Sequence, residues 1–422
     1  MRRFIHIFTS VTFLFTFACC EGELDYDKDD DAPNPEEIIL PAGNYISFHA
    51  DVNSRASLQT SQYITKPFGV YGYQYDFSNT WDAQRVLAKP NVFWNLNGST
   101  KLPLKVSYNN NGIYNYTADG AYDETMDTIT KQVNWTSNRY AFWAYYPYKD
   151  NNSNFSVSSM TSVGAPYVTY TVDRTTTKNM YDVMTGGVSQ VTAANSGNTV
   201  TFTMYHRLSA VDVSISNVYE HEYDVDGVNH IEDVDIVITD LKLTFNNLKY
   251  SSAKIFLEQN KNIPALNTVL TTAADMSATY QLVGTNSEIA DSVTITPTTT
   301  VKTNLTADND ATMTFIPQDT TDISVTVTGS YYMIGKTTNA RISKLRVNED
   351  GEPLDSNGNV TKDENAFVYD NEFTINKQTN FNQALVESTR YYIVLNFTSE
   401  AVSINIITAE AWDEKTVDYE FM

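Results

Sequence analysis

Apolar and polar residues alternate along most of this chain with a period of two. The clearest run is residues 199–215, in which every second side chain from Val200 to Ala210 is apolar, except for His206. This period places alternate side chains on opposite faces of a β-strand. The pattern therefore predicts one strand at 199–215, with His206 as a hydrogen-bonded histidine on its core-facing side.

Similar runs continue through the rest of the chain, separated by turns rich in Asn, Asp and Gly. They lie at residues 68–73, 140–147, 234–245, 253–257, 311–316, 323–332, 391–397 and 401–411. No long amphipathic helix interrupts them, so we predict an all-β fold of tandem β-sandwiches. The acidic, weakly patterned residues 219–233 give the best boundary, with domains at 38–220 and 221–422.

The stretch at residues 44–56 is predicted to be the first strand of the first domain. Ile46 and Phe48 alternate with polar residues, and a polar turn carrying Arg55 follows. Between the N-terminal leader and Arg55, the only other basic residue is Lys28. We therefore expect Arg55 to be an accessible arginine directly after a core-forming strand.

Residues 1–18 have the composition of an export signal. Arg2 and Arg3 precede an apolar run of fifteen residues, which is shorter than the about 20 residues that a membrane-spanning helix needs. Ala18 comes directly before Cys19, as the signal peptidase of bacterial lipoproteins requires. We predict lipid attachment at Cys19, with Cys20 as the alternative; an ordinary secretory signal stays possible on this pattern.

Residues 19–37 are acidic and interrupted by prolines, which predicts a disordered tether. The whole chain carries 51 Asp and Glu against 28 Lys and Arg, a net charge of −23. This balance argues against a nucleic-acid partner or an anionic membrane surface, since both favour basic proteins. With two cysteines in the leader region and 41% apolar residues, the body must be stabilised by a large core rather than by disulfides.

The chain shows none of the motifs that carry catalysis or metal binding. Its five histidines form no paired zinc spacing, and it has no nucleophile elbow, P-loop or dinucleotide fingerprint. The calcium-like run that begins at Asp355 has Val360 and Ala366 where glycine and glutamate are needed. We predict no enzyme activity, no metal site and no cofactor.

Two features suggest binding rather than catalysis. The candidates for an aromatic platform that binds a sugar are Trp81, Trp94, Trp135, Trp143 and Trp412, although Trp143 lies in a strand with aromatic residues on both faces, which more often indicates burial. At the C-terminal end, Val417, Tyr419 and Phe421 alternate with polar residues. This tail fits either an ordinary last strand or a strand offered to a partner, and the pattern does not separate the two.

Several of these elements follow one another in a distinctive order. They are Cys19 with its acidic segment, ISF at 46–48 with SRA at 54–56, the strands at 68–73 and 140–147, YDVM at 181–184, and HRLS at 206–209 within the run 200–215. In order and spacing they resemble the fimbrillin family, which are subunits of the type V pili of Gram-negative anaerobes. The resemblance covers most of residues 19–216, whereas the second half is similar in its β pattern and tail.

The resemblance implies two transthyretin-like Greek-key sandwiches and export to the cell outer membrane as a lipoprotein. It also implies cleavage after Arg55 by a surface Arg-specific protease, so that Ala56 becomes the new N-terminus. Polymerisation with other copies or related pilus subunits would follow by donor-strand exchange, with the tail as donor, and the fimbria would contribute to adhesion to host or bacterial surfaces. The alternative is a surface glycan-binding lipoprotein of a polysaccharide-uptake system.

Overall fold

The computed structural model describes residues 46–52, 62–64, 66–92, 103–108, 114–117, 133–149, 151–196, 199–258, 268–285, 287, 289–297, 303–306, 312–399 and 402–409. All of them belong to one compact unit, Gly43–Met422. Within these residues, helices are confined to α1 (Trp81–Gln84), α2 (Ala193–Ser196) and the 3-10 helix η4 (Glu364–Ala366). The remaining regular structure is β-strand, so the all-β prediction is confirmed.

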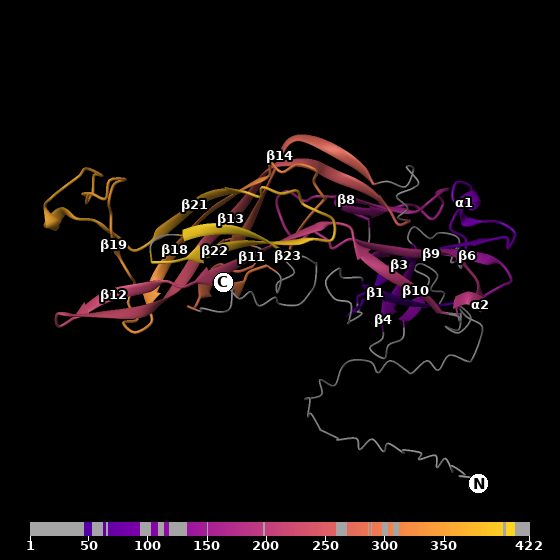
Figure 1. Ribbon diagram of the computed structural model, residues 1–422, viewed down its shortest axis with the longest axis horizontal. Helices are drawn as coiled ribbons and strands as arrows, with labels where there is room; N and C mark the ends of the chain where they lie inside the picture. The colour runs from indigo at the N-terminus through magenta and orange to yellow at the C-terminus, as the bar shows by residue number, and fades with distance from the viewer. Residues whose placement is uncertain are drawn as a thin grey trace, which may run out of the picture. The chain divides into compact units, whose positions relative to one another are not determined.

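The first sheet closes on itself. Its strands are β1 (Ser47–Val52), β2 (Gln62–Tyr63), β3 (Phe68–Tyr75), β4 (Leu104–Tyr108), β5 (Tyr114–Thr117), β6 (Arg139–Tyr146), β9 (Met184–Val191) and β10 (Thr199–His206). They follow the order β10-β9-β6-β3-β4-β5-β1-β2, and β1 also pairs with β10. Strand β1 therefore joins the two ends of the sheet, and β1, β4 and β10 lie together in Figure 1.

The inward-facing side chains of this closed sheet form a core of their own. It contains Ile46, Phe48, Ala50, Phe68, Val70, Leu104, Val106, Tyr140, Phe142, Ala144, Val200, Phe202 and Met204, among others. The opposite faces of β3 and β6 carry Tyr71, Tyr73, Trp143 and Tyr145, which are also buried. These two strands are thus covered on both faces, and this explains why their sequences are apolar at consecutive positions.

Two further sheets share the second core. One contains β11 (Ser209–Asn217), β16 (Thr303–Asn304), β17 (Met313–Phe315), β22 (Arg390–Phe397) and β23 (Val402–Ala409). The other contains β7 (Phe155–Val157), β8 (Tyr167–Thr171), β12 (Glu220–Val225), β13 (Val228–Phe256), β14 (Val269–Val283), β15 (Val293–Ile295), β18 (Ser324–Gly335) and β21 (Phe373–Asn380). A small pair, β19 (Lys344–Leu345) and β20 (Tyr369–Asp370), stands apart from both (Figure 1).

The predicted strand at 199–215 is two strands in two different sheets. β10 has the expected alternation of exposed and buried side chains, but it ends at His206. At Arg207 the backbone N–H donates to the carbonyl of Val183, and β11 then pairs in parallel with β22. The prediction of one continuous strand was wrong because the period of two continues unchanged through the crossing point.

The acidic residues 219–233 form part of an extended hairpin between β12 and the start of β13. Strands β8 and β11 precede this hairpin, yet β8 pairs with the later part of β13 and β11 pairs with β22, while β7 joins the sheet through β8. Each of the two sheets therefore contains strands from before and from after residue 220 of the sequence. The division into domains at this point stays a prediction.

Gly187 of β9 allows close packing on Trp143, and its replacement tests this contact. A Cβ atom at Gly187 would lie 2.0 Å from Cε3 of Trp143 and 2.8 Å from the carbonyl oxygen of Phe142. We expect Gly187→Ala to lower the free energy of unfolding by about 1–3 kcal/mol through overpacking. Urea denaturation followed by tryptophan fluorescence measures this, with Ser189→Ala at an exposed position of the same strand as the control. Equal stability of Gly187→Ala and wild type would contradict the packing.

Candidate functional site around strand β1

Strand β1 places every second side chain in the interior of the closed sheet. Ile46, Phe48 and Ala50 are 1%, 2% and 0% exposed. The ring of Phe48 stacks on Phe202 with centroids 5.6 Å apart and meets the edge of Phe142 at 5.5 Å. Burial of one such ring contributes about 1.5–3 kcal/mol. β1 is thus a structural part of this core and not a surface strand.

The backbone of β1 runs parallel to β10, from Ser47 beside Thr199 to Val52 beside Met204. On its outer face, the Ser47 and Thr199 hydroxyls lie 2.8 Å apart. Pairing with β5 is limited, among the described residues, to Phe48 opposite Tyr114. Parallel pairing is slightly less stable per residue than antiparallel pairing. Packing of the apolar side chains of β1 therefore contributes much of the stability of this strand in the sheet.

The residues predicted to carry function lie outside the described residues. This holds for Cys19 and Cys20, for Arg55 and Ala56, and for the tail residues Val417, Tyr419 and Phe421. The structure does describe the strands that precede two of these sites. β1 ends three residues before Arg55, and β23 ends at Ala409, before the tail. Their proposed roles stay predictions.

Strand β23 is the edge of its sheet within the described chain. It pairs with β22 in antiparallel register from Val402 to Ala409. Val402, Ile404 and Ile406 pack against the second core, which agrees with the alternation in the sequence. The C-terminal tail thus continues from an edge strand that is anchored on one face.

Two lysines contact tyrosine rings near the end of β6. Nζ of Lys105 lies 5.5 Å from the centroid of the Tyr148 ring. The N–H of Tyr148 donates to the carbonyl of Pro67 at 3.1 Å. Lys149 follows Tyr148, and its Nζ lies 4.0 Å from the centroid of the Tyr181 ring.

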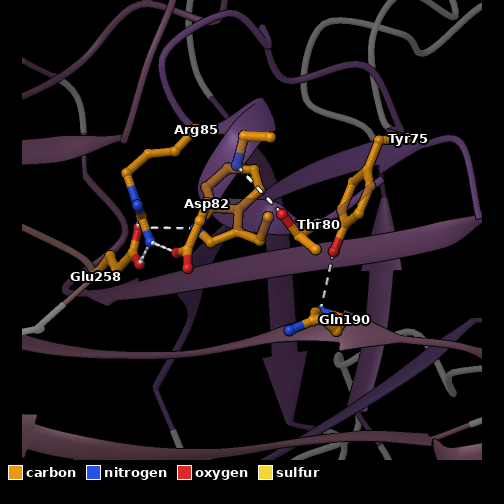
Figure 2. Close-up of polar contacts among 8 residues, drawn as sticks. Tyr75, Thr80, Asp82, Arg85, Gln190 and Glu258 are labelled. Carbon is orange, nitrogen blue, oxygen red and sulfur yellow. Dashed lines mark hydrogen bonds and ion pairs between the residues drawn. The ribbon is translucent and has the colours of Figure 1, made fainter. Parts of the chain in front are cut away.

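A buried ion pair fixes the connection that contains α1 (Figure 2). Nε of Arg85 donates to Oε2 of Glu258 at 2.6 Å, Nη2 donates to Oε1 of the same carboxylate, and Nη2 also donates to Oδ1 of Asp82 at 2.6 Å. The indole N–H of Trp81 donates to Oε2 of Glu258 at 2.8 Å. The hydrogen bond with Glu258 raises the pKa of the Arg85 guanidinium, so it stays charged. The network holds the connection that contains α1 against Glu258, two residues after the end of β13. It contains no nucleophile.

The tryptophans do not form a sugar platform in the described chain. Trp81, Trp135 and Trp143 are 2%, 5% and 6% exposed. Trp81 packs against Tyr73 with ring centroids 4.9 Å apart, and Trp135 packs against Tyr140 at 5.0 Å. The prediction of a glycan platform at Trp81 and Trp135 was wrong, because their rings fill the cores instead of facing solvent.

His206 is a core histidine, as predicted. It is 5% exposed, and its Nδ1 lies 2.7 Å from Oδ1 of Asp182. No group of three or more histidine, cysteine or acidic side chains that could hold a metal ion occurs among the described residues. A search of the same residues finds no helix both long and apolar enough to cross a membrane.

The sequence analysis missed a buried carboxylate in the second core. Asp212 is 0% exposed, and its Oδ1 accepts hydrogen bonds from Oγ1 of Thr306 at 2.9 Å and of Thr312 at 2.7 Å. Its Oδ2 lies 3.3 Å from Nε of Arg390. An aspartate between two valines inside a strand is the signal that pointed to it. Its partners are structural, since they tie β11 to β22 and to the segment around β16.

The chain is similar to several solved structures but matches no known sequence family. No family model matches the chain, and no curated protein matches it. Among solved structures, a fimbrial protein from Bacteroides vulgatus is 16% identical, with 87% of this chain and 99% of that chain covered and a TM-score of 0.49. A candidate cell adhesion protein from Bacteroides ovatus is 14% identical, with 89% and 100% covered and a TM-score of 0.43. Similarity at this level assigns no function to the chain.

The Arg85–Glu258 pair should be far more sensitive to substitution than an exposed pair. We expect Arg85→Met to lower the free energy of unfolding by about 3–5 kcal/mol, because it leaves the Glu258 carboxylate buried without its partner. Arg346→Met is the matched control: its pair with Asp370 is more than a third exposed on each side, so a loss below about 1 kcal/mol is expected. Chemical denaturation measures both, and similar losses for the two variants would contradict this assignment.

Proposed function

We propose that this chain is a structural subunit of a surface fimbria of the type V pilus kind. In this proposal it is exported as a lipoprotein with lipid on Cys19, is cut after Arg55 on the cell surface, and polymerises by donor-strand exchange. The fimbria then contributes to adhesion. The observation that carries the proposal is the place of β1: a short strand that closes a sheet, fills its core and leads directly toward Arg55.

The position of β1 supports a removable strand. It forms no hairpin with its main partner β10, which lies about 150 residues later in the sequence. A cut after Arg55 would release β1 with everything that precedes it. Its loss would leave β10 with an unpaired edge and leave Phe202 and Phe142 without the ring of Phe48. An exposed edge beside an apolar groove is a template for another strand.

The tail has the length and alternation that this groove needs. β1 contains six residues, and residues 417–422 are also six, a span of about 20 Å as an extended strand. Val417, Tyr419 and Phe421 recur with the same period of two as Ile46, Phe48 and Ala50. In the proposed polymer, the tail of one copy takes the place of β1 in the next copy and restores both the pairing and the core.

The burial of the tryptophans favours this proposal over a glycan-binding lipoprotein. That alternative depended on Trp81 and Trp135, which lie inside the cores. The proposed assembly depends instead on β1 and on the tail. The partners in this proposal are other copies of the chain or related pilus subunits, a surface Arg-specific protease and the outer-membrane lipid.

Cleavage at Arg55 is the first test of the proposal. When the purified precursor is incubated with an Arg-specific protease, we expect a product that begins at Ala56 and forms ladders on a gel without heating. Arg55→Ala should stay uncut at this position and monomeric. Arg174→Ala, at an exposed loop position, is the control and should be cut after Arg55 like wild type. Ladders from Arg55→Ala, or a wild-type precursor that resists cutting there, would refute the proposal. N-terminal sequencing reads the result.

Removal of residues 417–422 tests the donor role of the tail separately. The shortened chain should be cut normally but should form no ladders alone, because it lacks the strand that fills the groove. Mixed with wild type, it should still accept a donor tail and so cap growing polymers. Lys415→Ala, which keeps the apolar alternation, serves as the control. Wild-type ladder yield from the shortened chain would show that another segment is the donor; size-exclusion chromatography with light scattering measures the yield.

A further inference from the structure

The last residue of β1 lies next to the point where the chain crosses from the closed sheet to the second core. β1 ends at Val52, which pairs with Met204 of β10. β10 ends two residues later at His206, and the carbonyl oxygen of His206 accepts a hydrogen bond from Oγ of Ser388 at 2.5 Å. Ser388 is therefore close to the end of the groove at which β1 leaves the sheet.

The last described strand ends beside the same point. β22 begins at Arg390, two residues after Ser388, and Arg390 pairs with Ala409, the last residue of β23. A side-chain contact supports this proximity, since Nη1 of Arg207 donates to Oε1 of Glu387 at 2.8 Å. The C-terminal tail therefore starts near the end of the closed sheet at which β1 leaves it.

The tail is long enough to reach the groove of its own chain. The pairings from Ala409 through Arg390, Ser388 and His206 to Val52 cross three strand spacings of about 5 Å and four residue steps of about 3.3 Å. This path measures about 28 Å, and the straight line between its ends is shorter. The eight peptide units from Ala409 to Val417 span about 27 Å when extended. Val417 therefore reaches the position that Val52 would leave.

The Val52 end is also the nearer entry to the groove. Ser47, at the other end of β1, pairs five residues further back along β10, a distance of about 17 Å. Entry at Val52 thus needs the shorter connection. A tail that enters there runs toward the Ser47 end, antiparallel to β10, with Val417, Tyr419 and Phe421 on the inner side of the sheet.

We propose that, after the cut at Arg55, the tail fills the groove of its own chain and that this closed monomer competes with exchange between copies. The inference rests on the proposed function and adds to it a form that limits assembly. The occupant of the groove is residues 417–422 of the same chain, connected through residues 410–416. The groove offers the same backbone pairing and the same apolar core to either tail, as in domain swapping.

The connection decides between the two forms. A short tether gives the tail an effective concentration in the millimolar range at its own groove, provided that it spans the distance without strain. Residues 410–416 would be largely extended in the closed monomer, which lowers this concentration below that of a relaxed tether. Dilute cut chains are therefore closed monomers, and exchange between copies gains as the chains are concentrated.

Disulfide trapping in dilute solution tests the closed form. A chain with Asp418→Cys and Thr203→Cys is cut after Arg55, which also removes both natural cysteines. With Val417 beside Met204, the two new thiols lie opposite each other on the outer face of the sheet, within the range for a disulfide. We expect a disulfide within the monomer, read by size-exclusion chromatography with light scattering and by mass spectrometry of the non-reduced peptides.

Two controls make this result specific. The pair Asp418→Cys and Thr199→Cys places the second thiol at the Ser47 end of the groove and should give at most about a tenth of the yield. A dilute mixture of chains that carry either Asp418→Cys or Thr203→Cys should give equally little, because contact between copies is then rare. A mixture that matches the double variant, or a higher yield with Thr199→Cys, would overturn the proposal.

The length of the connection gives a second test. Insertion of Gly-Ser-Gly-Ser after Glu414 relaxes residues 410–416 and should lower the ladder yield at a fixed concentration about tenfold, since it favours the closed monomer. The same insertion after Gly358, at an exposed turn, is the control and should keep the wild-type yield. An unchanged yield after the insertion at Glu414 would overturn the role of the connection.

The two tests distinguish the closed monomer from exchange between copies. If the double variant closes as a monomer but ladders form at no concentration, exchange between copies fails and the closed form stands. If ladders form but the dilute double variant gives no disulfide, the closed form fails and donor-strand exchange stands.

Discussion

The closing of the first sheet by β1 is the constraint on which this structure depends. One short strand pairs with β10 along its whole length and places Phe48 between the rings of Phe202 and Phe142. The same six residues therefore provide backbone pairing for the edge strand β10 and apolar side chains for the core. Loss of β1 would expose both at once, and burial of apolar surface together with backbone pairing can be restored only by another strand with the same alternation. In the proposed function, this double role is what would let the removal of β1 control assembly.

The sequence predicts the strands well and their partners poorly. Alternation identified β10, β22 and β23, because each has one face on a core and local periodicity reports that face. It did not reveal the change of sheet at Arg207, since the period is the same on both sides. The parallel pairing of β1 with β10 was equally invisible, because a partner about 150 residues away leaves no local signal. Trp81 and Trp135 show the same limit: composition offers aromatic rings, and only packing decides whether they face a ligand or a core.

The candidate site shows this limit for charges as well. The buried pair of Arg85 and Glu258 joins residues that are 173 positions apart. By contrast, Asp212 could be recognised as unusual from its neighbours alone, because a carboxylate in an apolar strand must find donors when it is buried. Ion pairs of this kind add little net stability relative to apolar packing, but they define how connections are placed once the sheets have formed.

In the proposed assembly, covalent attachment would allow β1 and the tail to use one groove without conflict. While β1 is joined to its own sheet by a short connection, its effective concentration is in the millimolar range or above, and a tail from another molecule must compete against this advantage. The proposed cleavage after Arg55 would remove the connection but none of the contacts of β1, so that only affinity would then decide which strand remains. In this proposal the cut would need no energy of its own to drive assembly, because it would end the advantage that keeps the precursor closed.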